Sequence, residues 1–218
     1  MTVSRPNKRT DIRLLQAGRK ILLEQGIDRL TVSAICKLAK VNQGMFVYNF
    51  KNKSMFMNKL LNNLLSDVLK ELVLKDNIQK KPIERMEYGL VFCGVAAVKY
   101  PQLFLQFNNN MLLSDDERKK TMTQLFIRRC NRELRRIFRF FPLAQADGDI
   151  STKITMAEFL ALIWPPLIYS CIAMEPIINA LPTKYRQPPD VFLTHDAVRT
   201  RVRKLLRGFR PENYDPEC

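Results

Sequence analysis

The chain has 218 residues, 46% of them hydrophobic, so it has enough apolar surface for a folded core and is not expected to be disordered. With 36 Lys and Arg against 21 Asp and Glu, its formal net charge of +15 favours a polyanionic partner, either nucleic acid or an anionic membrane surface. Only 7 glycines and 12 prolines occur, which favours helices joined by short loops over a β-sandwich or a glycine-dependent nucleotide fold.

Three short helices are predicted in the first fifty residues, after a polar and basic arm at residues 1–9. Thr10 is placed to cap the first helix, and Gly26 ends it where a left-handed residue closes the last turn. Thr31 and Asn42 are the expected caps of the second and third helices. Apolar residues at helical spacing form the expected inner faces: Leu14, Ala17, Gly18, Ile21, Leu22, Val32, Ile35, Cys36, Ala39, Phe46 and Phe50.

A longer amphipathic helix follows, with Asn52 as its cap and an apolar stripe of Phe56, Leu60, Leu61, Leu64, Leu65, Val68, Leu69 and Leu72. Further along the chain we expect helices at about 82–99, 101–112, 114–141, 152–180 and 194–208. No β-hairpin signal or internal repeat is present. The predicted fold is therefore all-α, with a small three-helix unit followed by a larger helical bundle.

The segment from Thr31 to Phe50 has the parts of a helix-turn-helix: a supporting helix, a tight turn at Lys40-Val41, and a helix whose outward residues can enter the major groove. Asn and Gln side chains can bond an adenine edge, Met and Val can contact thymine methyl groups, and Tyr48 can donate to a phosphate. Helix N-termini at Thr31 and Lys53 favour backbone phosphates. The candidate DNA contacts are Thr31, Lys40, Asn42, Gln43, Gly44, Met45, Val47, Tyr48, Asn49 and Lys53.

Positive charge is concentrated at this end of the chain. Residues 1–53 contain 11 Lys and Arg but only 3 Asp and Glu, a net charge of +8 in a quarter of the length. An ordinary helical corner with solvated polar residues remains the simpler interpretation of residues 31–53, but the basic charge disfavours it.

The spacing of these residues resembles the N-terminal domain of the TetR family of bacterial repressors over about residues 10–60. The family pattern runs approximately T-V-x-x-I-A-x-x-A-G-V-S-x-G-T-L-Y-x-H-F-x-x-K. The matching segments are Thr31-Val32-x-x-Ile35, Ala39-Lys40-Val41-Asn42-Gln43-Gly44, Tyr48-Asn49-Phe50 and Asn52-Lys53. The C-terminal part matches the family only in its helix layout.

Some positions depart from the family pattern. Lys40 replaces the turn glycine, which strains the turn or adds a phosphate contact. Met45 and Val47 replace the usual threonine and tyrosine, so two expected phosphate hydrogen bonds are missing, and Cys36 stands where alanine is commoner. The operator sequence therefore does not follow from the resemblance.

The resemblance implies a homodimer that binds an operator in double-stranded DNA, with recognition helices in successive major grooves about 34–36 Å apart. It implies a DNA-binding domain at residues 1–53, and a ligand-binding and dimerisation domain at 54–218 whose last two large helices pack against their twins. A small molecule among the helices between residues 82 and 180 would swing the fourth helix and release a repressor from its operator.

Two sets of residues are candidates for ligand contact. Aromatic and sulfur-bearing side chains that could line an effector cavity are Phe92, Cys93, Phe104, Phe107, Met111, Phe126, Trp164 and Tyr169, although hydrophobic core is the simpler interpretation for each. The arginine-rich stretch at 118–139 is interpreted as a solvated face, with an anionic effector or acidic partner as the alternative.

Neither secretion, a membrane span nor catalysis has support. The N-terminus lacks an apolar segment, and the apolar run Phe159 to Met174 is too short to cross a bilayer and contains two prolines. Five widely spaced cysteines without C-x-x-C indicate reduced thiols rather than a redox sensor. His195 is the only histidine, and no hydrolase, zincin or P-loop motif occurs. We expect a cytoplasmic protein that is not an enzyme and holds no metal or cofactor.

Two rival functions remain open. The loss of two phosphate hydrogen bonds at Met45 and Val47 would suit a small-molecule-binding or interaction module. Such a module would keep the helical scaffold but no longer read DNA. The charge of +15 and the broken apolar run would suit a protein that binds anionic lipid through its helix surfaces. Gel-shift with DNA separates the first rival from a regulator, and liposome co-sedimentation tests the second.

Overall fold

The computed structural model describes residues 8–73, 81–113, 137–186 and 190–214, with positions 124, 128, 135 and 188, and the regular structure in these parts is helical throughout. The chain divides into two compact units, Met1–Asp67 with Gln102–Arg129, and Val68–Pro101 with Cys130–Cys218. The sequence predicted a domain boundary between residues 53 and 54, where the helix Lys53–Val73 begins. The first compact unit includes this helix as far as Asp67.

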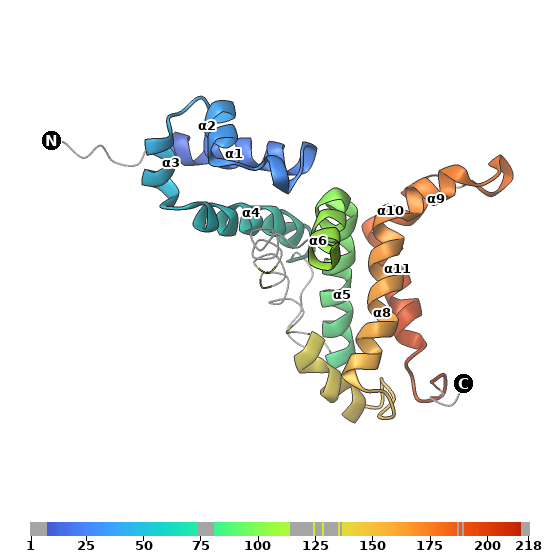
Figure 1. Ribbon diagram of the computed structural model, residues 1–218. Helices are drawn as coiled ribbons and strands as arrows, with labels where there is room; N and C mark the ends of the chain where they lie inside the picture. Colours follow the sequence, from blue (N-terminus) through green and yellow to red (C-terminus); the bar gives the residue numbers. More distant parts are fainter. Residues whose placement is uncertain are drawn as a thin grey trace. The chain divides into compact units, whose positions relative to one another are not determined.

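The first unit begins with three helices packed on one another, α1 (Lys8–Glu24), α2 (Val32–Ala39) and α3 (Gln43–Phe50), as Figure 1 shows. A short 3-10 helix, η1 (Ile27–Arg29), joins α1 to α2, and α4 (Lys53–Val73) follows α3. The predicted all-α fold with an N-terminal three-helix unit is therefore confirmed.

Three phenylalanines hold α3 against the rest of the first unit. The ring centroids of Phe46 and Phe50 lie 5.2 and 4.9 Å from that of Phe56 on α4, and all three side chains are buried. Gly18 on α1 lies beneath the ring of Phe56, where a Cβ would come within 2.8 Å of Cε1. This aromatic cluster fixes which face of α3 points inward. The predicted stripe of α4 is buried from Phe56 to Leu65, and the side chains of Val68, Leu69 and Leu72 lie outside the described residues.

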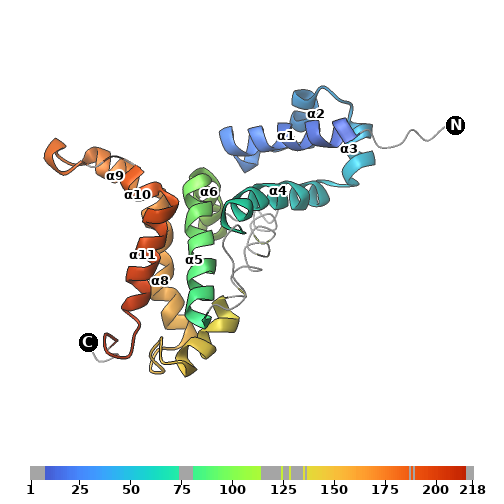
Figure 2. The same ribbon diagram turned by 180° about the vertical axis from the view of Figure 1, so that it is seen from behind.

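The second unit is built on three long helices, α5 (Pro82–Lys99), α8 (Met156–Ile172) and α11 (His195–Arg207), which lie side by side in Figures 1 and 2. Gly94 on α5 allows the close approach, because a Cβ there would lie 2.6 Å from Cγ1 of Val198. Glu87 on α5 accepts a 2.9 Å hydrogen bond from Nε of Arg203 on α11. This unit also contains α9 (Met174–Ala180), η2 (Thr183–Tyr185) and α10 (Asp190–Leu193), whereas α6 (Pro101–Leu113) belongs to the first unit from Gln102 onward.

Two predicted helix beginnings are wrong. Thr10 is not the cap of the first helix, because α1 already begins at Lys8 and buries Thr10 inside it. The helix predicted from residue 152 begins only at Met156, because Thr155 and Glu158 form a capping box: Thr155 N–H donates to Glu158 Oε2 at 2.8 Å, and Glu158 N–H donates to Thr155 Oγ1 at 3.2 Å. The hydrogen bonds that the Glu158 carboxylate accepts from Thr155, first from the backbone N–H and then from the hydroxyl, hold the pKa of Glu158 below its ordinary value.

One predicted helix end and one predicted continuous helix are wrong as well. The helix expected to end at residue 141 continues to residue 146, where buried Ala144 and two hydrogen bonds from Gln145 Nε2 to the carbonyl oxygens of Ser151 and Ile154 stabilise the added turn. The helix predicted over 152–180 is two helices, α8 and α9, with a bend of 62° between them. Pro176 has no N–H to donate to the carbonyl oxygen of Ile172, so one hydrogen bond of a continuous helix is missing near this bend.

No single helix among the described residues is long and apolar enough to cross a membrane. The bent pair α8 and α9, taken together, has the length and apolar composition that a span needs. Cys36, Cys93 and Cys171 are buried, and burial raises the pKa of the Cys36 and Cys171 thiols. A raised pKa reduces thiolate character and disfavours redox sensing at these two positions.

Candidate nucleic-acid interface

Side-chain caps define both helices of the helix-turn-helix. Oγ1 of Thr31 accepts a hydrogen bond from Ala34 N–H at 3.1 Å at the beginning of α2, and Oδ1 of Asn42 accepts one from Met45 N–H at 2.9 Å at the beginning of α3. Both caps have extended backbone, as capping residues require. The predicted roles of Thr31 and Asn42 as caps are confirmed.

The turn between α2 and α3 depends on two basic residues. Lys40 has φ 54° and ψ 49°, the left-handed region that favours glycine, and its N–H closes the end of α2 on the carbonyl oxygens of Cys36 and Lys37. Arg13 on α1 donates from one guanidinium nitrogen to the carbonyl oxygens of Ala39 and Lys40. The guanidinium charge therefore stabilises the negative end of α2 and ties the turn to α1.

Helix α3 has a buried and an exposed face. Phe46 and Phe50 are 1% and 3% exposed, whereas Val47 and Tyr48 are 55% and 46% exposed on the opposite side. Gln43 and Gly44, in the first turn, are exposed as well. The helix therefore lies on the surface of the first unit and presents its outward residues, as the sequence predicted.

The three amide side chains on this helix differ in what they already bind. Oδ1 of Asn42 is held by the cap, and Nδ2 of Asn49 donates to the carbonyl oxygen of Met45 at 2.7 Å. Both groups have part of their hydrogen-bonding capacity used within α3. Gln43 is exposed and has no such bond among the described residues, so it is the best placed of the three to read a base edge.

Further polar groups follow α3 directly in the sequence, at the beginning of α4. Oδ1 of Asn52 accepts a hydrogen bond from Met55 N–H at 2.9 Å, which confirms the predicted cap. Lys53 is half-buried at the first position of α4, and Lys51 is exposed with φ 59°. An N-terminal helix dipole with adjacent lysines suits a phosphate. Sequence analysis missed Lys51, and its unusual backbone has no sequence signal.

The other predicted DNA contacts have mixed exposure. Thr31 and Lys40 are exposed, and Met45 and Asn49 are half-buried. The bridge formed by Arg13 was not predicted from the sequence, because its partners on α2 lie 26 and 27 residues along the chain.

The candidate ligand-contacting residues are not gathered into one described cavity. Phe92 and Cys93 are buried on α5, Phe104 is buried on α6, and Trp164 is half-buried on α8. Tyr169 is 52% exposed on α8, so the expectation that it lines an interior cavity does not fit its position. The side chains of Phe107, Met111 and Phe126, and most of the arginine-rich stretch at 118–139, lie outside the described residues.

Comparisons with known proteins agree with this geometry. Residues 14–59 match the model of the family described as bacterial regulatory proteins, tetR family. A crystal structure assigned to a TetR-family transcriptional regulator from Rhodococcus sp. superimposes with a TM-score of 0.59 at 14% identity, over 93% of this chain and 99% of that chain. A transcriptional regulator from Rhodococcus sp. Rha1 aligns over 95% of this chain and 100% of that one, with 16% identity and a TM-score of 0.47. No curated protein matches at a significant level.

Proposed function

We propose that the chain is a DNA-binding transcriptional regulator of the TetR family, and more specifically a homodimeric repressor that a small molecule releases from its operator. The match of residues 14–59 to that family supports this proposal. The observation that supports this most directly is the orientation of α3, whose phenylalanines are buried while Gln43, Val47 and Tyr48 face solvent. In this proposal Gln43 reads a base edge, Val47 contacts an apolar base surface, and Tyr48 donates to a phosphate.

Lysines around α3 support an electrostatic contribution to DNA binding. Lys40 and Lys51 are exposed at the two ends of α3, and Lys53 follows at the beginning of α4. Contacts of this kind orient a protein on the duplex without specifying the sequence, and they make affinity fall steeply with salt.

Apolar side chains on the outside of α8 support the proposed homodimer. Leu162 and Tyr169 are both 52% exposed, seven residues apart on one helix face, and Pro165 and Pro166 lie exposed between them. On α11 the exposed positions are polar or basic, including Arg203, Lys204 and Arg207. We therefore assign the central, apolar part of the dimer contact to α8, and α11 to its polar rim.

A small-molecule effector has its support in the resemblance to the family and in the apolar helices of the second unit. Phe92, Cys93 and Trp164 are the candidates for contacting it that lie in the second unit.

The test is selection of duplexes from a random pool by the full-length chain, followed by titration of the enriched sequence. We expect an enriched inverted repeat with half-site centres about one helical turn apart, and a protein that is dimeric at the concentrations used. Asn58→Ala, a half-buried position on α4 outside the predicted contacts, is the matched control and should select the same sequence. Enrichment of no sequence would favour the rival function of a binding module that no longer reads DNA.

A further inference from the structure

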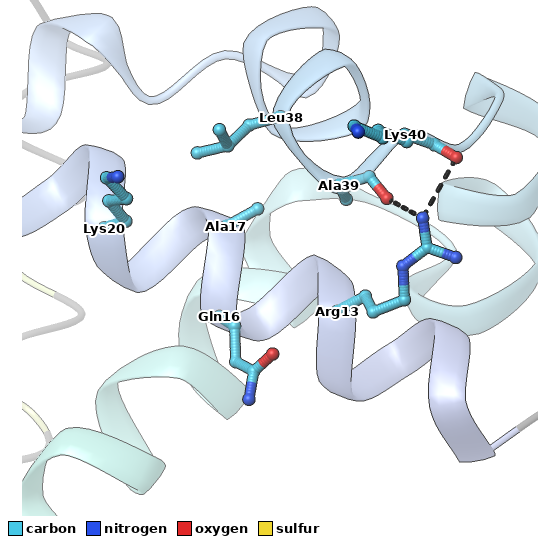
Figure 3. A pocket seen from close by; sticks show the side chains of 7 residues that line it. All are labelled: Arg13, Gln16, Ala17, Lys20, Leu38, Ala39 and Lys40. Carbon is cyan, nitrogen blue, oxygen red and sulfur yellow. Dashed lines mark hydrogen bonds between the residues drawn. The ribbon is translucent and has the colours of Figure 1, made fainter.

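A groove of about 290 Å³ lies on the first unit, between α1 and the end of α2 (Figure 3). Arg13, Gln16, Ala17 and Lys20 on α1 form one side, and Leu38, Ala39 and Lys40 form the other. All seven residues belong to the same compact unit, and none is among the residues of α3 assigned above to base contact, although Lys40 is also one of the lysines assigned to electrostatic DNA contact.

The groove combines an apolar base with a positive rim. Ala17 and Ala39 are buried at 6% and 5%, whereas Leu38 is 43% exposed and leans into the groove rather than into the core. In Figure 3 the side chain of Leu38 lies between those of Lys20 and Lys40. No acidic residue lines the groove, so the charges of Arg13, Lys20 and Lys40 are not neutralised from within it.

Arg13 contributes to this rim a positive charge whose position is set by hydrogen bonds within the protein. Its guanidinium is held by the carbonyl oxygens of Ala39 and Lys40, so its position does not depend on a ligand. A bound anion would therefore meet one anchored positive charge and two flexible lysines, which can close on it at the entropic cost typical of long side chains.

We propose that this groove binds a small organic anion, a monocarboxylate with a compact apolar body. The carboxylate would lie against the lysines and the guanidinium, and the apolar body would cover Leu38 and the two alanines. The apolar wall distinguishes this occupant from a DNA phosphate or inorganic phosphate, neither of which gains from contact with Leu38. The site goes beyond the proposed function, because it lies on the DNA-binding unit and not among the helices proposed to hold the effector.

The size and openness of the groove set the expected strength of binding. A volume of about 290 Å³ is at the lower end for a ligand pocket, and a ligand of roughly ten heavy atoms bound at a solvent-exposed site corresponds to a dissociation constant on the order of 1 mM. An exposed charge pair accounts for a change of about two- to fivefold in that constant.

The experiment is a titration of the full-length protein, carrying ¹³C-labelled Leu and Ala methyl groups, with sodium benzoate as the probe. We expect saturable shifts of the Leu38, Ala17 and Ala39 methyl resonances, and little shift with benzamide, the neutral isostere. Lys20→Gln and Lys40→Gln should each raise the dissociation constant about two- to fivefold. Lys37→Gln, an exposed lysine on α2 outside the groove, should leave it unchanged.

Three outcomes would overturn the proposal: no saturable shift at these methyl groups, equal binding of benzamide, or equal effects of the three lysine substitutions. Equal binding of inorganic phosphate would show a simple anion contact without a role for Leu38, and would also contradict it. A DNA phosphate as occupant would appear instead as a loss of DNA affinity in Lys20→Gln without benzoate binding to the native protein. Because the methyl readout contains no DNA, failure of this proposal is distinguishable from failure of the proposed repressor function.

Discussion

Oε1 of Gln106 on α6 accepts a hydrogen bond of 3.0 Å from the backbone N–H of Ile27 in η1. The side chain passes so close to Gly26, which has φ 88°, that a Cβ there would lie 2.8 Å from Nε2. A helix from the middle of the chain thus holds the connection between α1 and α2, and the adjacent glycine leaves room for it.

Removal of this acceptor is expected to weaken the first unit. Gln106→Ala leaves the N–H of Ile27 without its protein partner and should lower the free energy of unfolding by about 1 kcal/mol, with faster hydrogen exchange at that amide. Gln106→Glu keeps an acceptor oxygen and should lose less. Gln102→Ala, an exposed glutamine on the same helix, is the control. The same loss in Gln102→Ala would show that the hydrogen bond contributes nothing specific.

Asn42 has two separable roles, as a cap and as a residue on the proposed DNA face. Asn42→Ala should lower the free energy of unfolding by about 1 kcal/mol, because Met45 N–H loses its acceptor. Asn42→Asp should keep this stability, since a carboxylate also caps and is favoured at a helix N-terminus, but it should weaken DNA binding through charge repulsion. Urea unfolding measures the free energy of unfolding of both variants, and DNA titration measures their affinity for DNA. Full DNA affinity in Asn42→Asp would place the cap away from the duplex.

Lys40 occupies a left-handed backbone position that costs a non-glycine residue about 1–2 kcal/mol. Lys40→Gly removes this strain but adds chain entropy to the unfolded state, so we expect a gain in unfolding free energy of up to about 1 kcal/mol. DNA affinity should fall at the same time, because a positive charge is lost. Lys37→Gly, inside α2, should instead destabilise by about 1 kcal/mol. A destabilised Lys40→Gly variant would show that the lysine side chain contributes more than the strain removes.

The assignment of the dimer contact to α8 predicts a change of oligomeric state on introducing charge there. Leu162→Glu and Tyr169→Glu should shift the protein to a monomer in sedimentation velocity experiments, because two like charges would face each other across the symmetry axis. Leu143→Glu, which alters a side chain 47% exposed elsewhere in the second unit, is the matched control. An unchanged dimer in both α8 variants would require another interface.

Local signals were predictable from the sequence, and distant contacts were not. The caps Thr31, Asn42 and Asn52 were identified because each satisfies N–H groups within three residues of itself. The same rule misplaced the beginning of α1, since Thr10 has the correct residue type but lies two residues after the helix begins at Lys8. A cap shows that a helix can begin at a residue, whereas packing of the neighbouring turn decides whether it does.

The features that were not predictable from the sequence depend on tertiary contacts. The bond from Ile27 to Gln106 joins residues 79 apart, and the contacts of Arg13 with the end of α2 join residues 26 and 27 apart. No periodicity indicates such pairs. The exposed face of α3 was predictable because two phenylalanines four residues apart define its inner side, but the commitment of Asn49 to the carbonyl oxygen of Met45 was not.

DNA reading is assigned to the outward face of α3, and Gln43→Ala examines that assignment at a single side chain. Fluorescence anisotropy should compare native protein, Gln43→Ala and Tyr48→Ala on the selected duplex and on duplexes with each base pair changed in turn. We predict that Gln43→Ala loses about 1–3 kcal/mol of discrimination at one base position, whereas Tyr48→Ala loses about 1 kcal/mol on every duplex. Equal losses on all duplexes for Gln43→Ala, or a native protein that binds every duplex alike at low salt, would contradict the account.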